Sequence, residues 1–431
     1  MLVPSYRKRA LRRACAALAA AALLIPGSQA GATTPDAAYR TPVAKGSATA
    51  RAAISASKLR SGLAAQLRRS GGSGGAWVGD PVTGETLFAG GAARPLRLAS
   101  NMKLFTTATA LSRIGPEEQF ETRLIADGDV SDGVVRGNLI LVGGGDPSLT
   151  SQGLARLAGQ VRAAGIQRVK GRVLYDESIF DSKRAISQPG ISGGRFAELG
   201  RLSGLSFESG RSVHPARSAA LSLIAILRKR GVTMSKKTGA GTAPEVPSAE
   251  QEIGEATSSS LALLSRATNV FSLNFYAEML VKLIGVAERE RGSTKAGIAE
   301  ITEFSQEAGA PLRAVNGSGL SRTDIATPRA VGALLTHMLE EEEEKVRDAF
   351  LGSLAVAGGS GTLAGRMRGS AAQGKCIGKT GTLTGVSALS GYCEVTPDRF
   401  VVFSILMNRV DIGRAHVAQD RMTALLARYR P

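Results

Sequence analysis

Residues 98–107 read Leu-Ala-Ser-Asn-Met-Lys-Leu-Phe-Thr-Thr, and they say more about the architecture than any other stretch of the chain. Ser100 and Lys103 open a run that the sequence predicts as a helix over residues 101–113, ended by Gly115 and Pro116. In a helix that begins at Ser100 the two side chains share one face. Its N-terminal end offers free N–H groups and a positive dipole, which favour an alkoxide or oxyanion. Taken alone, the pair is better explained by an N-cap serine with an exposed lysine.

Two further short motifs follow later in the chain. Ser272, Leu273 and Asn274 form a Ser-x-Asn motif, and residues 379–382 read Lys-Thr-Gly-Thr. Each motif is weak by itself in a chain rich in Ser, Lys and Arg. In this order, however, Ser-x-x-Lys, Ser-x-Asn and Lys-Thr-Gly resemble the catalytic set of penicillin-binding proteins and serine β-lactamases.

The residues around the motifs narrow this resemblance. From about residue 77 to the C-terminus, the chain resembles the class C low-molecular-mass penicillin-binding proteins, the D-Ala-D-Ala carboxypeptidase/endopeptidase family. The resemblance implies an α+β fold, namely the penicillin-binding/serine β-lactamase-like transpeptidase fold (an antiparallel sheet with helices) with an inserted, smaller α/β domain. The segments that carry it are residues 98–107, 141–147, 274–278, 317–322, 378–383 and 389–392.

The order of predicted helices and strands, together with the resemblance, suggests how the chain is divided. We expect a catalytic domain split between residues 56–125 and 258–431, with the inserted domain at 126–257. Three strands are predicted close to the C-terminus, at 377–383, 388–395 and 400–407, and they are typical of an antiparallel sheet.

The insertion departs from the family pattern in two respects. Only 172 positions separate Ser100 from Ser272, which is shorter than in the long members of the family. We also do not find the Trp-containing segment that the resemblance leads us to expect after Phe180. The fine specificity for the stem peptide therefore does not follow from the sequence.

The N-terminus has the pattern of an export signal. A basic region with five Lys and Arg residues precedes an apolar stretch at 14–26, and Ser-Gln-Ala at 28–30 supplies the small residues of a cleavage site. A membrane anchor is the alternative, but spanning a bilayer takes about 20 apolar residues. We expect a signal peptide at 1–30, a flexible linker at 31–55, and a mature protein in the periplasm or the extracellular cell wall.

The chain is strongly basic, with a formal net charge of +18. Removing residues 1–30 takes away five positive charges and no acid, which leaves +13. Such a charge in an exported protein favours peripheral association with an anionic envelope. Nucleic acid is not an expected partner, because no nucleic-acid-binding motif is present and only one Trp and six Tyr are available for stacking.

Cysteine and histidine usage leaves one question open and argues against metal. Cys376 and Cys393 remain in the mature chain, and strand pairing would place them opposite each other. They are either a disulfide, which persists outside the cytosol, or two buried unpaired residues. The three histidines are isolated and no zinc-ligand spacing occurs, so we expect no metal site, and the expected chemistry needs no cofactor.

The chemistry of the first motif follows from its residue types. A serine hydroxyl needs a base to attack at neutral pH, and Lys103 can serve once desolvation and a second cation lower its pKa. Lys379 is the candidate for that cation. Such proton transfer contributes about 10²–10⁴ in rate. Ser100 and Lys103 are therefore the predicted nucleophile and base.

The resemblance assigns roles to the other motif residues. It implies that Ser272 relays a proton to the leaving amine, and that Asn274 orients Lys103 and hydrogen-bonds the substrate amide. Lys379 and Thr380 are implied to recognise the C-terminal carboxylate of a peptide ending in D-alanine.

The backbone around the third motif completes the predicted site. Gly381 allows close approach of the substrate backbone, and the N–H of Thr382 joins that of Ser100 in an oxyanion hole. Arg322 has two interpretations, a substrate-binding residue near the cleft or a surface arginine after a turn.

The expected function is that of a serine D-Ala-D-Ala carboxypeptidase/endopeptidase. It acts through an acyl-enzyme on peptidoglycan stem peptides ending in D-Ala-D-Ala and is inhibited by β-lactam antibiotics. Two alternatives stay open: a serine β-lactamase, which uses the same constellation, and a wall-binding protein without turnover.

Overall fold

The computed structural model describes residues 52–185, 200–244 and 247–431. The predicted signal peptide at 1–30 and nearly all of the predicted linker at 31–55 lie outside the described residues and stay predictions. Within the described ranges, no helix is both long and apolar enough to cross a bilayer.

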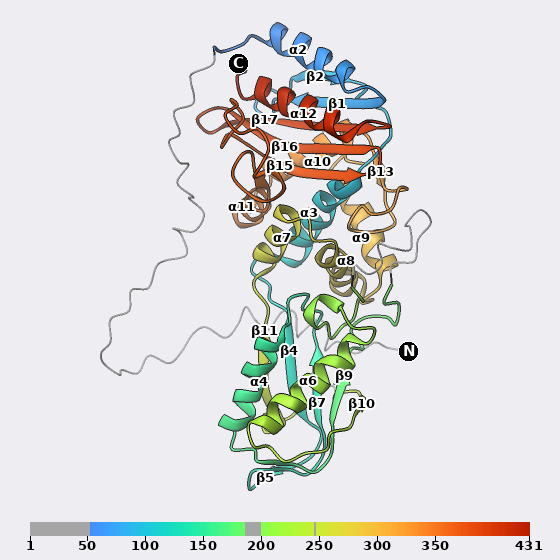
Figure 1. Cartoon of the computed structure of the whole chain (residues 1–431), viewed down its shortest axis with the longest axis vertical. Helices are drawn as coiled ribbons and strands as arrows, with labels where there is room; N and C mark the ends of the chain where they lie inside the picture. Colours follow the sequence, from blue (N-terminus) through green and yellow to red (C-terminus); the bar gives the residue numbers. More distant parts are fainter. Residues whose placement is uncertain (1–51, 186–199, 245–246) are drawn as a thin grey trace, which may run out of the picture. The chain divides into compact units, whose positions relative to one another are not determined.

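A six-stranded antiparallel sheet joins the two ends of the described chain (Figure 1). The strand order is β14-β15-β16-β17-β1-β2, so an early strand, β1, lies beside the last one, β17. The three strands predicted near the C-terminus are confirmed as β15, β16 and β17. The bounds are β1 Ser73–Gly79, β2 Thr86–Gly90, β14 Ala355–Val356, β15 Cys376–Leu383, β16 Val386–Thr396 and β17 Arg399–Asn408.

Helices cover both faces of this sheet. One apolar core includes side chains of α2 and α12, and a second includes side chains of α3, α8 and α10. Helix α3 is buried along most of its length, because α7, α8, α9 and α11 pack around it. The helix bounds are α2 Ala56–Arg69, α3 Met102–Ile114, α7 Leu261–Val270, α8 Asn274–Arg289, α9 Thr294–Glu307, α10 Pro328–Leu339, α11 Glu344–Gly352 and α12 Ile412–Leu426.

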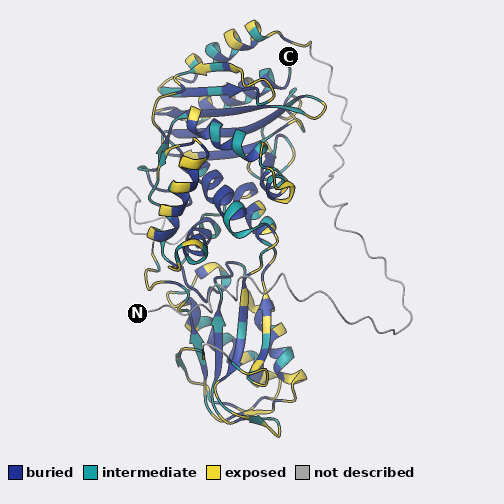
Figure 2. Ribbon diagram, turned by 180° about the vertical axis from the view of Figure 1, so that it is seen from behind, coloured by how far each residue is buried: buried dark blue, intermediate teal, exposed yellow. Residues whose placement is uncertain are grey.

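The alternation of side chains along β16 shows that both faces are covered. Ala388 and Tyr392 belong to the core that contains α3 and α10, whereas Leu389 and Cys393 belong to the core under α2 and α12. Successive side chains of a strand point to opposite faces. The middle of the sheet is therefore dark blue in Figure 2, where buried residues have that colour.

A separate five-stranded mixed sheet is formed between residues 121 and 257, in the order β10-β9-β7-β4-β11. Its core contains apolar side chains of helices α4 and α6. In the described part of the chain, strand β4 pairs only with β7 and β11, and the division into an inserted domain at 126–257 and a split catalytic domain stays a prediction. The bounds are β4 Glu121–Ala126, β7 Leu139–Gly143, β9 Val173–Asp176, β10 Thr238–Ala240, β11 Glu252–Thr257, α4 Ser151–Ala163 and α6 Pro215–Lys229.

Two small sheets complete the framework. One of them, in the order β12-β13-β3, brings the residues just before Ser100 beside those just after Asp324. Its strands are β3 Leu96–Arg97, β12 Leu312–Arg313 and β13 Ile325–Ala326, and the other sheet consists of β5 Val130–Ser131, β6 Val134–Val135 and β8 Arg168–Val169.

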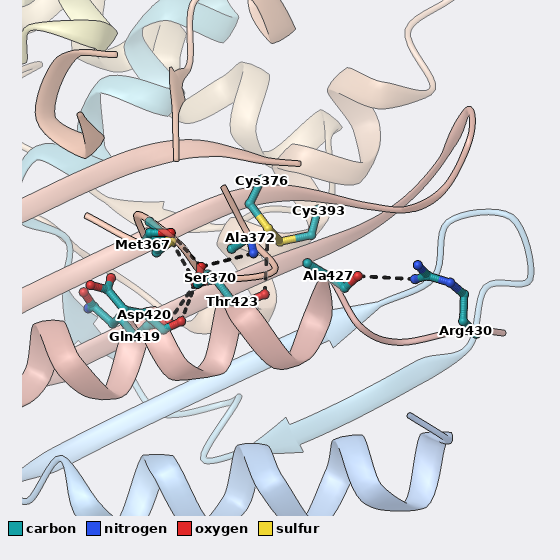
Figure 3. Close-up of a disulfide and its surroundings, with 10 residues drawn as sticks. All are labelled: Met367, Ser370, Ala372, Cys376, Cys393, Gln419, Asp420, Thr423, Ala427 and Arg430. Atoms are coloured by element: carbon teal, nitrogen blue, oxygen red, sulfur yellow. Dashed lines mark hydrogen bonds between the residues drawn. A yellow bond between two sulfur atoms is a disulfide. The ribbon is translucent and has the colours of Figure 1, made fainter. Parts of the chain in front are cut away.

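The cysteine question is answered by the register of β15 and β16. Cys376 and Cys393 are directly opposite each other, with a Cα–Cα distance of 4.1 Å, and form a disulfide. Figure 3 shows the bond beside α12, where the sulfur of Cys376 is 3.8 Å from the Thr423 carbonyl. The disulfide joins the start of β15 to β16 and so braces the strand that carries the Lys-Thr-Gly motif.

Candidate active site

Ser100 lies in a short 3₁₀ turn, Ala99–Asn101, between β3 and α3. The turn is anchored because the N–H of Leu98 donates to the Asp324 carbonyl over 3.0 Å. Ala99 has a φ of +46°, in the left-handed region that non-glycine residues rarely adopt. Such backbone strain persists only where the surroundings fix it, and it gathers at functional sites.

Lys103 follows on the first turn of α3, and its ammonium group has three partners. Nζ lies 3.1 Å from Ser100 Oγ, 2.7 Å from Asn274 Oδ1 and 2.7 Å from the Ser318 carbonyl oxygen. The side chain is fully buried. The structure thus brings together the predicted nucleophile, the predicted base and the Ser-x-Asn asparagine.

Burial lowers the pKa of Lys103 to about 7, against the opposing effect of the Glu278 and Asp324 carboxylates, which raise it. At neutral pH a substantial fraction of the amine is therefore unprotonated and able to accept a proton. Lys379, the candidate for the second cation, is also fully buried, but its charge is not among the causes of the Lys103 shift. Burial and then the charge of Lys103 hold the pKa of Lys379 well below its usual value.

The Ser-x-Asn motif forms the turn between α7 and α8. Asn274 is the first residue of α8, which aims its side-chain oxygen at Lys103. Ser272 is partly exposed and has a φ of +58°. Its hydroxyl makes no hydrogen bond within the described part of the chain, so its role as a proton relay stays a prediction.

The Lys-Thr-Gly motif lies in β15. Lys379 Nζ donates to the Thr380 carbonyl over 2.9 Å, and the Thr380 hydroxyl donates to Thr362 Oγ1 over 2.8 Å. A Cβ atom built on Gly381 would lie 3.0 Å from the backbone nitrogen of Ser100. Strand β15 therefore runs directly against the backbone of Ser100. Thr382, the next residue of this strand, has an exposed side chain.

Arg322 reaches the end of the same strand. Its Nη2 donates to the Thr384 carbonyl over 3.1 Å, two positions beyond Thr382. Its contact with substrate stays a prediction.

The sequence did not reveal the buried carboxylates that support this site. Glu278 accepts hydrogen bonds from the N–H groups of Ser318, at 2.8 Å, and Gly317, at 3.3 Å. Asp324 accepts from the N–H of Val315 at 2.8 Å, and burial raises the pKa of this carboxyl to about 8. Glu278 and residues 317–318 belong to segments that carry the family resemblance, but neither residue type nor spacing indicates that they meet around Lys103.

No group of three or more His, Cys, Asp or Glu side chains in the described ranges is placed to hold a metal ion. The polar groups in contact with Lys103 Nζ are the Ser100 hydroxyl, the Asn274 side-chain carbonyl and the Ser318 backbone carbonyl. A serine hydroxyl held against a buried amine in this way is suited to proton transfer and to nucleophilic attack at an acyl carbon.

A serine held by a buried lysine of lowered pKa defines a serine acyl-transfer enzyme. The chain belongs to the D-Ala-D-Ala carboxypeptidase 3 (S13) family, which it matches over residues 57–189 and 203–429. The predictions of the family, of the fold class and of a serine-type D-Ala-D-Ala carboxypeptidase are confirmed. The individual roles of the site residues stay proposals.

Curated relatives and solved structures agree with this assignment. The chain is 30% identical to a D-alanyl-D-alanine carboxypeptidase of Actinomadura sp. (strain R39), over 82% of this chain and 81% of the relative. It is also 30% identical to carboxypeptidase DacB of Mycolicibacterium smegmatis, over 81% and 79% of the two chains. Its fold is similar to that of penicillin binding protein 4 (dacB) from Haemophilus influenzae, with a TM-score of 0.71, 20% identity, and coverage of 84% and 97%.

Proposed function

We propose that the protein removes the terminal D-alanine from peptidoglycan stem peptides ending in D-Ala-D-Ala, through an acyl-enzyme on Ser100. The observation that carries this proposal is the 3.1 Å contact between Ser100 Oγ and Lys103 Nζ, in a buried setting that lowers the lysine pKa to about 7. A buried base of that pKa, in contact with a serine hydroxyl, is what nucleophilic attack at neutral pH requires.

The reaction has two halves. Ser100 Oγ attacks the carbonyl carbon of the penultimate D-alanine while its proton passes to Lys103. The peptide bond breaks, and the terminal D-alanine leaves with a proton on its amine, for which Ser272 is the proposed relay. Water then attacks the ester and restores the serine, releasing the shortened peptide.

The backbone N–H groups of Ser100 and Thr382 are the proposed oxyanion donors. The close approach of Gly381 to the Ser100 nitrogen supports this, because it puts β15 beside the reacting hydroxyl. Loss of one such donor costs about 10²–10³ in kcat.

We assign the substrate's C-terminal carboxylate to the side of the site formed by β15. The buried Lys379 amine is the proposed partner, since a bound carboxylate would favour its protonated form, and the Thr380 hydroxyl is held by Thr362. Arg322, whose Nη2 donates to the Thr384 carbonyl just beyond this strand, is the second proposed substrate-binding residue.

The same active-site residues are proposed to carry out two related reactions. A D-Ala–diamino-acid cross-link presents the same acyl group, so endopeptidase activity is part of the proposal. A β-lactam contains a strained amide that would acylate Ser100, and the Haemophilus influenzae protein of similar fold was determined in complex with a β-lactam.

The envelope is the proposed place of action. The basic region and apolar stretch ahead of residue 30 support export, and the charge of +13 that remains supports contact with anionic envelope polymers.

Release of D-alanine tests the proposal. The purified mature protein is incubated with an acylated tripeptide ending in L-Lys-D-Ala-D-Ala, and free D-alanine is measured beside the Ser100→Ala variant. Release by wild type alone, with none from the L-Ala-L-Ala peptide, supports the proposal. Absence of release by folded wild type, or equal release by the variant, would refute it. Rapid hydrolysis of penicillin in place of peptide cleavage would assign the site to a β-lactamase.

A further inference from the structure

The segment Val315–Gly319 is held from several sides at the base of the active site. Glu278 on α8 accepts from the N–H groups of Gly317 and Ser318 through its two carboxylate oxygens. The Thr106 hydroxyl on α3 donates to the Gly317 carbonyl over 2.9 Å. Ser318 and Glu278 are fully buried, so these contacts are protected from water.

Glycine is required where this segment meets its neighbours. A Cβ on Gly317 would lie 2.2 Å from Val281 Cγ2 on α8. Gly319 has a φ of +78°, and a Cβ there would lie 1.8 Å from the Ala99 carbonyl oxygen, next to the nucleophile. The backbone of residues 317–319, which includes the Ser318 carbonyl, is therefore fixed against both α8 and the Ser100 turn.

The partners of Lys103 determine where its lone pair points. A neutral lysine amine has two N–H donors and one lone pair. The Asn274 side-chain oxygen and the Ser318 carbonyl can only accept hydrogen bonds, and each lies 2.7 Å from Nζ. Both N–H donors are used on these two acceptors. The lone pair is then left facing the third partner, the Ser100 hydroxyl, at 3.1 Å.

We propose that Glu278 is a positioning residue for proton transfer: by fixing the backbone of residues 317 and 318, it holds the Ser318 carbonyl in place and so aims the lone pair of Lys103 at Ser100. The inference rests on the proposed function, because it concerns how the same site takes the serine proton. Glu278 touches neither Ser100 nor the substrate carbonyl in this account, and it acts through the 317–318 backbone.

Three titratable groups are coupled to the charge of Lys103. They are Glu278 from α8, Asp324 from the segment before β13, and Lys379 from β15. Burial raises the pKa of both carboxyl groups. The Glu278 charge raises the pKa of Lys103. Removing this charge lowers that pKa, and the unprotonated amine then persists to lower pH.

The test compares Glu278→Gln, Glu278→Asp and wild type by the rate of Ser100 acylation by penicillin as a function of pH. Glutamine has about the size of glutamate, but its NH₂ group cannot accept from one of the two N–H donors, so the 317–318 segment moves. We expect the plateau rate to fall at least about tenfold, with the acid-side midpoint at a lower pH than in wild type. Aspartate keeps the charge on a shorter stem, so the plateau should fall while the midpoint stays at the wild-type value.

Glu300 is the matched control. It is a buried carboxylate on α9 that pairs with Arg113 at 2.9 Å and Arg289 at 3.0 Å. Glu300→Gln should lower the thermal midpoint and leave the acylation profile of the folded protein unchanged.

The outcomes separate a positioning role from a merely structural one. If Glu278→Gln keeps the wild-type plateau and midpoint per folded molecule, Glu278 only stabilises the fold and the inference is wrong. If that variant does not fold, Glu278→Asp carries the test, and a wild-type plateau in it would overturn the inference. Failure of wild type itself to acylate would refute the proposed function instead.

Discussion

Gly381 lies against the backbone of Ser100 so closely that a methyl group at Gly381 would be 3.0 Å from the Ser100 nitrogen and 2.8 Å from the Leu98 carbonyl oxygen. Both atoms belong to the main chain of the turn that holds the nucleophile, so neither can rotate away. The distance between β15 and Ser100 thus depends on the absence of a side chain at this position.

Gly381→Ala should therefore impair acylation more than stability. Overpacking of this kind costs about 1–3 kcal/mol, and part of that strain displaces the proposed oxyanion donors, so we expect acylation by penicillin to slow at least about a hundredfold. Gly365→Ala is the control, because nothing lies within 4 Å of the added Cβ. Wild-type kinetics in Gly381→Ala would contradict the assigned geometry.

Lys103→Met should remove the base while filling a similar volume. We expect acylation to slow by about 10²–10⁴, measured by stopped-flow or gel labelling with a fluorescent penicillin. Lys282→Met provides the comparison, because Lys282 is also buried and donates to Asp181 over 2.6 Å. That variant should lose stability but acylate like wild type. Similar acylation by Lys103→Met and wild type would rule out Lys103 as the base.

The pH dependence of acylation follows from the pKa of Lys103. The lysine accepts the serine proton only when neutral, and it is neutral above its pKa of about 7. The acylation rate should therefore rise with pH to a plateau, with a midpoint near 7. A rate that does not change between about pH 5 and pH 9 would show that no such base limits the reaction.

Reduction of the disulfide should destabilise the protein without removing its chemistry. Cys376 and Cys393 are 17 positions apart, and closing a loop of about this length contributes about 3 kcal/mol in the chain-entropy treatment. Denaturant unfolding with and without reductant measures the difference, and the Cys376→Ser/Cys393→Ser double variant should match the reduced wild type. Equal stability in both redox states would mean that the bond does not form in solution.

Local patterns predicted the elements that carry the motifs. The apolar run after Ser100, closed by Gly115 and Pro116, gave α3 to within a residue or two at each end. The strand pattern near the C-terminus gave β15–β17 with comparable accuracy, because their residues are buried on both faces. Antiparallel pairing of the two strands already suggested that Cys376 and Cys393 lie opposite each other. Whether they form a disulfide could be decided only once the register of β15 and β16 was known.

Contacts between residues that are far apart in the sequence could not be predicted in the same way. Pairing of β1 with β17 joins Ser73 to Asn408, and no local pattern specifies that partner. The third contact of Lys103 is a backbone carbonyl, at Ser318, which has no residue-type signature. Glu278 has the spacing of an ordinary core position on α8, so its function became visible only when the 317–318 segment was placed against it.

Covalent labelling of Ser100 is the most direct test of the account. The mature protein is incubated with penicillin at pH 8, digested, and analysed by mass spectrometry. We predict one added penicillin mass, on the peptide that contains Ser100, and no addition in Ser100→Ala. A label on another residue, or a folded wild-type protein that neither retains nor turns over penicillin, would contradict the assignment of Ser100 as the nucleophile.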